Sequence, residues 1–362
     1  MIVKQRAIST KKCWGVTYLR SLLSSMTGRS AASQNCCRTY ACFNIKVVGQ
    51  LKKLESLYSF DFHAMGTECV LHLYADSVEF VENVAQLAMH EIFRIERKYS
   101  RFNSDSLLSQ INQAAHFGTE ITVDTETADL MDYAFSCHKL SDGLFDITSG
   151  LLSSAWDYES EDLPNPITLM ELLHFVGMDK LRWSRPILNF SVAGMELDFG
   201  GIGKEYAADQ VVALCREQGI KSGLVELGGD IAVIGAHPNE SPWVINIRHP
   251  RRGDVALSVV KLHHGALATS GDYERFIEVD GVRYCHLLNP YTGWPIKDGL
   301  SSISVVTDRC IVAGSLATIT MLKGSSEWLS AKGVPFLCAN QDGEVETNTL
   351  TIERAPAIAG AL

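Results

Sequence analysis

The chain lacks the short motifs that most directly reveal a protein's chemistry. Its 362 residues contain no HExxH zinc motif, no GxSxG nucleophile elbow and no CxxC pair. After residue 56, no apolar run approaches the roughly 18 residues that a membrane-spanning helix requires. The chemistry must therefore be inferred from weaker signals.

Negative charge is nearly absent from the first 55 residues, which hold ten Lys or Arg and a single acid, Glu55. Because the whole chain has a net charge of −10, the remainder is strongly acidic, which argues against nucleic acid as a partner. We interpret residues 1–55 as a basic, disordered N-terminal segment. A presequence and a start assigned too far upstream both explain this composition. Residues 56–355 are expected to form one folded domain.

The ten cysteines show no metal-binding spacing. Six of them lie singly among apolar neighbours, and we expect these to be buried free thiols in a reducing compartment: Cys69, Cys137, Cys215, Cys285, Cys310 and Cys338.

Periodicity and cap residues predict a mixture of strands and helices. Residues 57–75 alternate, which predicts two strands joined by a turn at Met65-Gly66, and Ser77 fits the N-cap of a helix ending near residue 100. Further helices are expected at 104–114, 124–143 and 203–218 and from about 308, with strands between them. Since helices and strands do not alternate strictly, the predicted fold class is α+β, with mixed or antiparallel sheets and packed helices.

The stretch LDFGGIGKEYAADQV, residues 197–211, places three glycines between a strand-like segment and a helix. It is not a Walker A loop, because Lys204 is followed by Glu205 instead of Ser or Thr. It also lacks the third glycine of a dinucleotide fingerprint, since Tyr206 stands there. Two interpretations remain open: an anion site at a helix N-terminus beside Lys204, or a tight turn.

Three later stretches carry polar groups beside turns. Gly228-Gly229 precedes Asp230 between strand-like runs, which is typical of a hairpin. HLLNPYTGWPI places His286 where a strand ends, and a structural role and a catalytic role are both open for it. SGDYERF, residues 270–276, is either a solvated turn or a polar cluster that lines a pocket.

Taken in order, eight stretches resemble the ApbE family, the FAD:protein FMN transferases. They span about residues 57–350 and read FHAMGTECVLHL, KYSRFNSDSLLSQIN, DGLFDITSG, LDFGGIGKEYAAD, LVELGGDIAVIG, TSGDYERF, HLLNPYTGWPI and AGSLATITMLKG. The resemblance implies a T-fold-related α+β domain that uses Mg²⁺. It also implies transfer of FMN from FAD to a Thr or Ser hydroxyl of a target flavoprotein, with release of AMP.

The resemblance also assigns site residues. It implies that His286 is catalytic, and that the metal is held by the Gly201 carbonyl and Thr318. The residues that it implies for cofactor binding are Met65, Phe102, Leu144, Phe145, Asp146, Asp198, Lys204 and Leu288.

The chain departs from the family at the metal site, where Gly314 stands in place of an aspartate ligand. Asp308 and Asp272 are candidates to compensate, and an aspartate introduced at 314 is expected to strengthen Mg²⁺ binding. The loss leaves two alternatives open: a protein that binds or sequesters FAD without transfer, and an FAD pyrophosphatase that releases FMN and AMP.

The compartment follows only from missing signals. No lipobox is present, so an intracellular, cytoplasmic location is expected, with an organelle or the periplasmic side of an inner membrane as alternatives. The oligomeric state is not predicted.

Overall fold

A nine-stranded sheet forms the centre of the computed structural model, which describes residues 50–348 apart from 55, 161, 254 and 298, together with 352–353. Every neighbouring pair in this sheet is antiparallel. In spatial order its strands are β1 Gln50–Leu54, β2 Leu57–Ala64, β3 Thr67–Tyr74, β7 Gly223–Leu227, β8 Asp230–Gly235, β11 Ala266–Gly271, β14 Ser302–Thr307, β15 Phe336–Ala339 and β16 Val345–Thr347.

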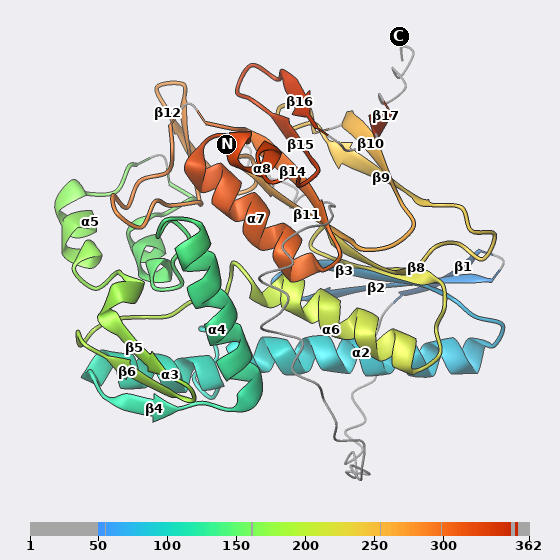
Figure 1. The fold of residues 1–362 in the computed structure, drawn as a ribbon, viewed down its shortest axis with the longest axis horizontal. Helices are drawn as coiled ribbons and strands as arrows, with labels where there is room; N and C mark the ends of the chain where they lie inside the picture. The colour runs from blue at the N-terminus through green and yellow to red at the C-terminus, as the bar shows by residue number, and fades with distance from the viewer. Residues whose placement is uncertain are drawn as a thin grey trace, which may run out of the picture.

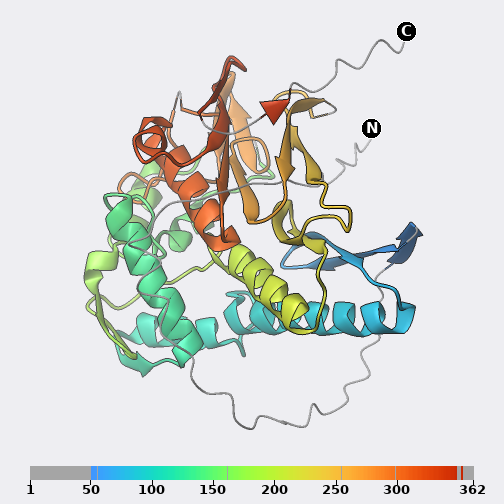
Figure 2. The same cartoon turned by 45° about the vertical axis from the view of Figure 1, so that its right-hand side comes forward.

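Three long helices pack against the sheet: α2 Val78–Tyr99, α6 Gly203–Glu217 and α7 Cys310–Lys323 (Figures 1 and 2). Helix α7 contacts β11 and β14, and α6 contacts β7 and β8. In β2 the residues at alternate positions are buried, as expected for a strand with one face on the core, whereas every residue of β14 is buried. Helices α6 and α7 also contact each other, and the first turn of α6 meets α7 at Gly314.

The remaining elements lie beside the central sheet and its three helices. Figure 1 shows α3, α4, α5 and β4 to β6 together on one side of the molecule. Their bounds are α3 Leu107–Phe117, β4 Glu120–Thr122, α4 Thr125–Leu140, η1 Ser149–Ala155, α5 Pro166–Leu173, η2 Met178–Lys180, β5 Leu181–Ser184 and β6 Ile187–Phe190. Two further small sheets are β17-β10-β9 and β12-β13, with bounds β9 Trp243–Arg248, β10 Ala256–Leu262, β12 Phe276–Val279, β13 Val282–Cys285 and β17 Ile352–Glu353; the short α8 is Glu327–Ser330.

The α+β fold class is confirmed, and so are several local predictions. Ser77 caps α2 and accepts a hydrogen bond from the Phe80 amide. Gly228 and Gly229 form the β7–β8 hairpin turn with φ of 54° and 83°, values that glycine adopts without strain. Strand β1, Gln50–Leu54, lies just before the predicted boundary at residue 55 and pairs with β2. The rest of the basic segment lies outside the described residues.

The six predicted thiols are all buried and free, as expected. Burial raises the pKa of Cys137 and Cys285 to about 11, so both thiols stay protonated at neutral pH. The cysteines of residues 1–55 lie outside the described part of the chain.

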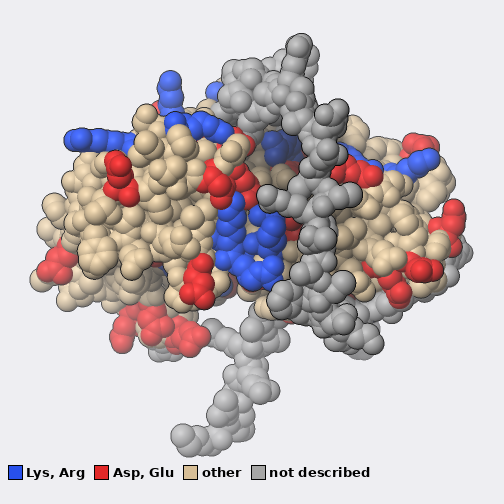
Figure 3. Space-filling view, turned by 90° about the horizontal axis from the view of Figure 1, so that it is seen from below, with Lys and Arg blue, Asp and Glu red and all other residues tan. Residues whose placement is uncertain are grey.

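On the face seen in Figure 3, acidic side chains are scattered, and Lys and Arg gather in a hollow near the middle. This local cluster differs from the broad basic stripe that nucleic-acid binding proteins present. Among the described residues, no helix has the length and apolar character needed to cross a membrane.

Candidate active site

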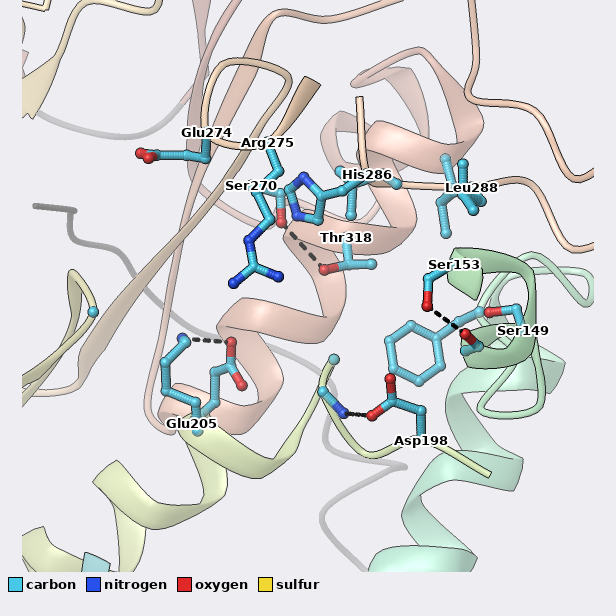
Figure 4. Close-up of a pocket in the computed structure, with 18 of the residues that line it drawn as sticks. Ser149, Ser153, Asp198, Glu205, Ser270, Glu274, Arg275, His286, Leu288 and Thr318 are labelled. Carbon is cyan, nitrogen blue, oxygen red and sulfur yellow. Dashed lines mark hydrogen bonds and ion pairs between the residues drawn. The ribbon is translucent and has the colours of Figure 1, made fainter. Parts of the chain in front are cut away.

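A cavity of about 440 Å³ lies where the β7–β8 turn and the end of β11 meet the loops after α4 and β13. Its volume is within the range of small-molecule and cofactor sites. The wall draws on segments that are far apart in sequence, from Met65 to Leu322. Figure 4 shows that side chains from these segments converge on one space.

The turn between β2 and β3 contributes Met65, Gly66 and Thr67 to the wall. Met65 has a φ of +53°, an uncommon conformation for a residue with a side chain. Its backbone amide donates a hydrogen bond to Glu96 Oε1 at 2.6 Å, which ties the turn to α2. The carboxylate of Glu96 therefore fixes where the Met65 side chain meets the cavity.

The loop after α4 contributes Leu144, Phe145 and Asp146. Asp146 is 8% exposed, and its Oδ1 accepts hydrogen bonds from the Thr148 amide at 2.7 Å and hydroxyl at 2.5 Å. Its Oδ2 accepts from the Met178 amide at 3.0 Å. Because both oxygens already have internal partners, the Asp146 carboxylate positions this loop.

Asp198 stands at the start of the glycine turn and faces the cavity. Its Oδ1 accepts from the Gly200 amide at 2.7 Å, and its Oδ2 lies 3.7 Å from Arg101 Nε. Gly150 packs against it so closely that a Cβ there would lie 2.4 Å from Asp198 Cβ. Gly150 therefore has no room for a side chain, and Asp198 packs directly against its backbone.

Lys204 and Glu205 open α6 at the floor of the cavity, opposite Asp230 of β8. Lys204 Nζ forms an ion pair with Asp230 and lies 2.9 Å from Glu205 Oε1. Both carboxylates are nearly buried, with side chains 6% and 10% exposed. One ammonium thus lies between two carboxylates, and the trio carries one net negative charge.

The opposite wall carries His286, Arg275 and Leu288. The His286 amide donates to the Arg275 carbonyl at 3.0 Å, which joins the two segments that flank the β12–β13 hairpin. In Figure 4 the Arg275 side chain extends toward the part of the cavity where Thr318 and Glu205 lie. The Thr318 hydroxyl is 3.1 Å from the Ser270 hydroxyl.

Nearly all of the residues assigned from the sequence line this cavity. Those that do are Met65, Leu144, Phe145, Asp146, Asp198, Gly201, Lys204, His286, Leu288 and Thr318. Phe102 does not: its residue is 88% exposed, and its ring lies 5.1 Å from the Arg101 guanidinium carbon. Arg101, the residue before it, lines the cavity instead.

Sequence reasoning left other wall residues unassigned, among them Arg101, Ser149, Ser153, Tyr158, Glu205 and Asp230. Of the SGDYERF stretch, Ser270, Glu274 and Arg275 line the cavity, which favours the polar cluster over the solvated turn. The sequence shows the turn Gly228-Gly229 followed by Asp230, but only the fold places Asp230 beside Lys204. Tyr158 carries no local motif that would have revealed it.

The structure shows that neither predicted substitute for the missing metal-binding carboxylate lines the cavity. Asp272 binds Arg251 with both oxygens, at 2.6 and 2.7 Å, and does not line the cavity. Asp308 is exposed and also lies outside the lining. Among the described residues, no three His, Cys, Asp or Glu side chains form a cluster suited to a metal. A metal in this cavity would need hydroxyl, carbonyl and water oxygens besides any carboxylate.

The ApbE family profile matches residues 65–333, which cover all of the cavity wall. The chain belongs to the ApbE family. The FAD:protein FMN transferase of Vibrio cholerae is 31% identical over 252 residues, covering 67% of this chain and 75% of that protein. The FAD:protein FMN transferase of Treponema pallidum is 29% identical over 282 residues, covering 72% and 77%.

Solved ApbE structures share the fold. The crystal structure of the ApbE protein from Thermotoga maritima aligns with a TM-score of 0.74 at 30% identity, over 81% of this chain and 97% of that one. The flavin transferase ApbE from Vibrio cholerae aligns with a TM-score of 0.71 at 26% identity, over 81% and 98%.

Proposed function

We infer that this ApbE chain transfers the FMN half of FAD to a Thr or Ser hydroxyl of a target flavoprotein and releases AMP. Family membership and relatives named FAD:protein FMN transferase support this function. The single observation that carries it is the cavity of about 440 Å³, because His286 shares its wall with Met65, Asp198 and Lys204. Residues suited to bind a nucleotide and a residue suited to accept a proton therefore line the same cavity.

The cavity offers complementary surfaces for the two parts of FAD. Met65, Leu144, Phe145 and Leu288 present apolar groups that suit the faces of flat rings. For the pyrophosphate, the amides at the start of α6 and the side chain of Arg275 provide positive charge, whereas the Lys204 ammonium is already paired with Asp230 and Glu205. Phe102 stays a candidate contact only for a part of the ligand that extends beyond the described cavity.

The reaction then needs positioning and one proton transfer. The acceptor hydroxyl oxygen attacks the phosphorus of the FMN phosphate and forms a new P–O bond. The bridging P–O bond to AMP breaks, and AMP leaves with that electron pair. A ring nitrogen of His286 accepts the hydroxyl proton. The Arg275 side chain extends into the cavity in Figure 4 and is placed to stabilise charge on the phosphate oxygens.

We propose that this transfer depends on Mg²⁺, held by the Gly201 carbonyl and the Thr318 hydroxyl, both of which line the cavity. Mg²⁺ prefers oxygen ligands and usually keeps several waters, so it suits a site with few protein donors. Bound there, it would neutralise the pyrophosphate oxygens. Gly314 offers no side chain, so the site needs an anionic oxygen from elsewhere in the chain.

The proposed partner is a flavoprotein with an acceptor Thr or Ser, and the intracellular location stays a prediction. The test is to incubate the protein with FAD, Mg²⁺ and an acceptor that carries a flavinylation site, and to measure the mass of the acceptor. Attachment of one FMN per site supports transfer. FMN and AMP released without modification would indicate hydrolysis, and FAD bound without turnover would indicate a binding protein.

A further inference from the structure

One carboxylate oxygen of Glu205 is buried without a hydrogen-bond partner among the described residues, which is uncommon for a carboxylate. The residue is 7% exposed, and Lys204 Nζ lies 2.9 Å from its Oε1. Its Oε2 is buried and has no hydrogen-bond partner among the described residues. A buried polar atom without a partner is costly to leave unsatisfied, and more so when it is charged. Glu205, which lines the cavity, therefore has one carboxylate oxygen whose hydrogen-bonding capacity is unused among the described residues.

The same carboxylate occupies the space beside Gly314. A Cβ built on Gly314 would lie 2.6 Å from Glu205 Cγ, 2.9 Å from its Cδ and 2.9 Å from its Oε1. The Glu205 side chain, which comes from α6, thus reaches the point on α7 where a side chain of residue 314 would begin. Only glycine at 314 leaves room for Glu205 in this position.

Thr318 follows Gly314 by four residues in α7, so both lie on the same face of that helix. Thr318 and Glu205 both line the cavity (Figure 4). The Glu205 carboxylate therefore lies on the same face of α7 as the Thr318 hydroxyl, where a side chain at 314 would also lie. In addition, Glu205 lies in the first turn of α6, where the helix dipole favours a negative charge.

We propose that Glu205 supplies the carboxylate ligand of a divalent cation in this cavity, in the position that Gly314 leaves open. The proposal rests on the metal dependence proposed above and names the residue that provides the missing charge. Oε2 coordinates the cation while Oε1 keeps its contact with Lys204.

Direct measurement of Mn²⁺ binding tests the proposal without reference to turnover. Mn²⁺ serves as the probe, and its free form is followed by electron paramagnetic resonance with the full-length protein saturated with FAD, against a blank of FAD alone. Glu205→Gln keeps the shape of the side chain and removes its charge, and we expect it to weaken Mn²⁺ binding by about tenfold or more. Glu217→Gln, on the exposed side of the same helix, is the matched control and should bind as the unmodified chain does.

A second variant separates loss of a ligand from loss of fold. The double variant Glu205→Ala with Gly314→Asp removes the side chain that fills the space and returns a carboxylate from α7. We expect it to bind Mn²⁺ within about threefold of the unmodified chain, about 0.65 kcal/mol. Equal Mn²⁺ affinity in Glu205→Gln and the unmodified chain would overturn the proposal, as would an unmodified chain that binds no Mn²⁺. If Mn²⁺ binds through Glu205 but no acceptor is modified, the proposed function fails and the cation site stands.

Discussion

The backbone amide of Met65 donates a hydrogen bond to Glu96 Oε1 at 2.6 Å, although the two residues belong to different elements. Met65 holds a φ of +53° at the cavity wall, a conformation that costs on the order of 1–3 kcal/mol for a residue with a Cβ. Glu96 lies in α2 and stabilises that conformation through this hydrogen bond. The position of one predicted FAD contact thus depends on a residue outside the cavity lining.

Glu96→Ala should therefore weaken FAD binding more than it unfolds the protein. Loss of one hydrogen bond to a charged group costs about 1.5–3 kcal/mol, and part of this appears as a dissociation constant for FAD raised by about tenfold. Quenching of flavin fluorescence measures the affinity. Glu82→Ala, an exposed position of the same helix, is the control and should change neither affinity nor melting temperature. Unchanged affinity in Glu96→Ala would mean that the turn keeps its shape unaided.

Gly150→Ala should displace Asp198. The added methyl group would lie 2.4 Å from Asp198 Cβ and 3.0 Å from its Oδ2, so the carboxylate must move. Overpacking of this kind costs about 1–3 kcal/mol, and we expect weaker FAD binding with it. A calorimetric titration with FAD measures the effect.

The matched control for that variant is Gly203→Ala, at the start of α6. No atom lies within 4 Å of a Cβ at this position apart from its own neighbours, and alanine favours helix by up to about 1 kcal/mol. Gly203→Ala should bind FAD normally and melt at the same or a higher temperature. Normal FAD affinity in Gly150→Ala would show that Asp198 does not need its present position.

Stability below neutral pH should depend on Glu126. Burial raises the pKa of Glu126, but hydrogen bonds from Arg94, Lys98 and Tyr206 outweigh burial and lower this pKa from its ordinary 4.5 to about 2. A lowered folded-state pKa means that the stabilisation is complete above the unfolded value, near pH 4.5, and is lost as the pH falls toward 2. These contacts join α2, α4 and α6.

Glu126→Gln should therefore be less stable than the unmodified chain at pH 7, and the difference should shrink as the pH falls from 4.5 toward 2. Urea unfolding followed by circular dichroism at several pH values measures this difference. A difference that stays constant across this window would remove Glu126 from the acid response.

His286→Ala should separate chemistry from binding. Removal of a general base lowers rates by about 10²–10⁴-fold, whereas the apolar wall and Lys204 remain for FAD. We expect FMN transfer to fall by this factor and the FAD dissociation constant to stay within about twofold, about 0.4 kcal/mol. Stopped assays of the modified acceptor and a fluorescence titration measure the two quantities. Transfer at the original rate would exclude His286 from the reaction.

Local sequence signals predicted the turns and helix caps that depend on residues close together in the sequence. The turn at Met65-Gly66 and the Ser77 cap were recognisable because they rest on near neighbours. Helix α5, Pro166–Leu173, is not among the helices predicted from the sequence, because Asn165 and Pro166 are also typical of a loop, although here they form its N-cap and first turn. The run 266–279 reads as one strand, and the structure divides it into β11 and β12 at the polar turn that faces the cavity.

Long-range packing was beyond such signals. The pairing of β3 with β7 joins segments about 150 residues apart, for example Leu71 with Val225, and no local pattern encodes it. The contact of Glu205 with Gly314 depends on how α6 packs on α7. The sequence therefore suggested that an aspartate at 314 would strengthen metal binding, whereas the structure shows that Glu205 already fills the space where that side chain would begin.

Mass spectrometry of an acceptor flavoprotein domain with a Thr flavinylation site, incubated with the protein, FAD and Mg²⁺, tests the central claim most directly. We expect the acceptor to gain the mass of one FMN and AMP to appear in equal amount. The adduct should be absent when the acceptor Thr is replaced by Val or when Mg²⁺ is chelated. AMP and free FMN without an adduct on any acceptor, or FAD that stays bound and intact, would contradict transfer.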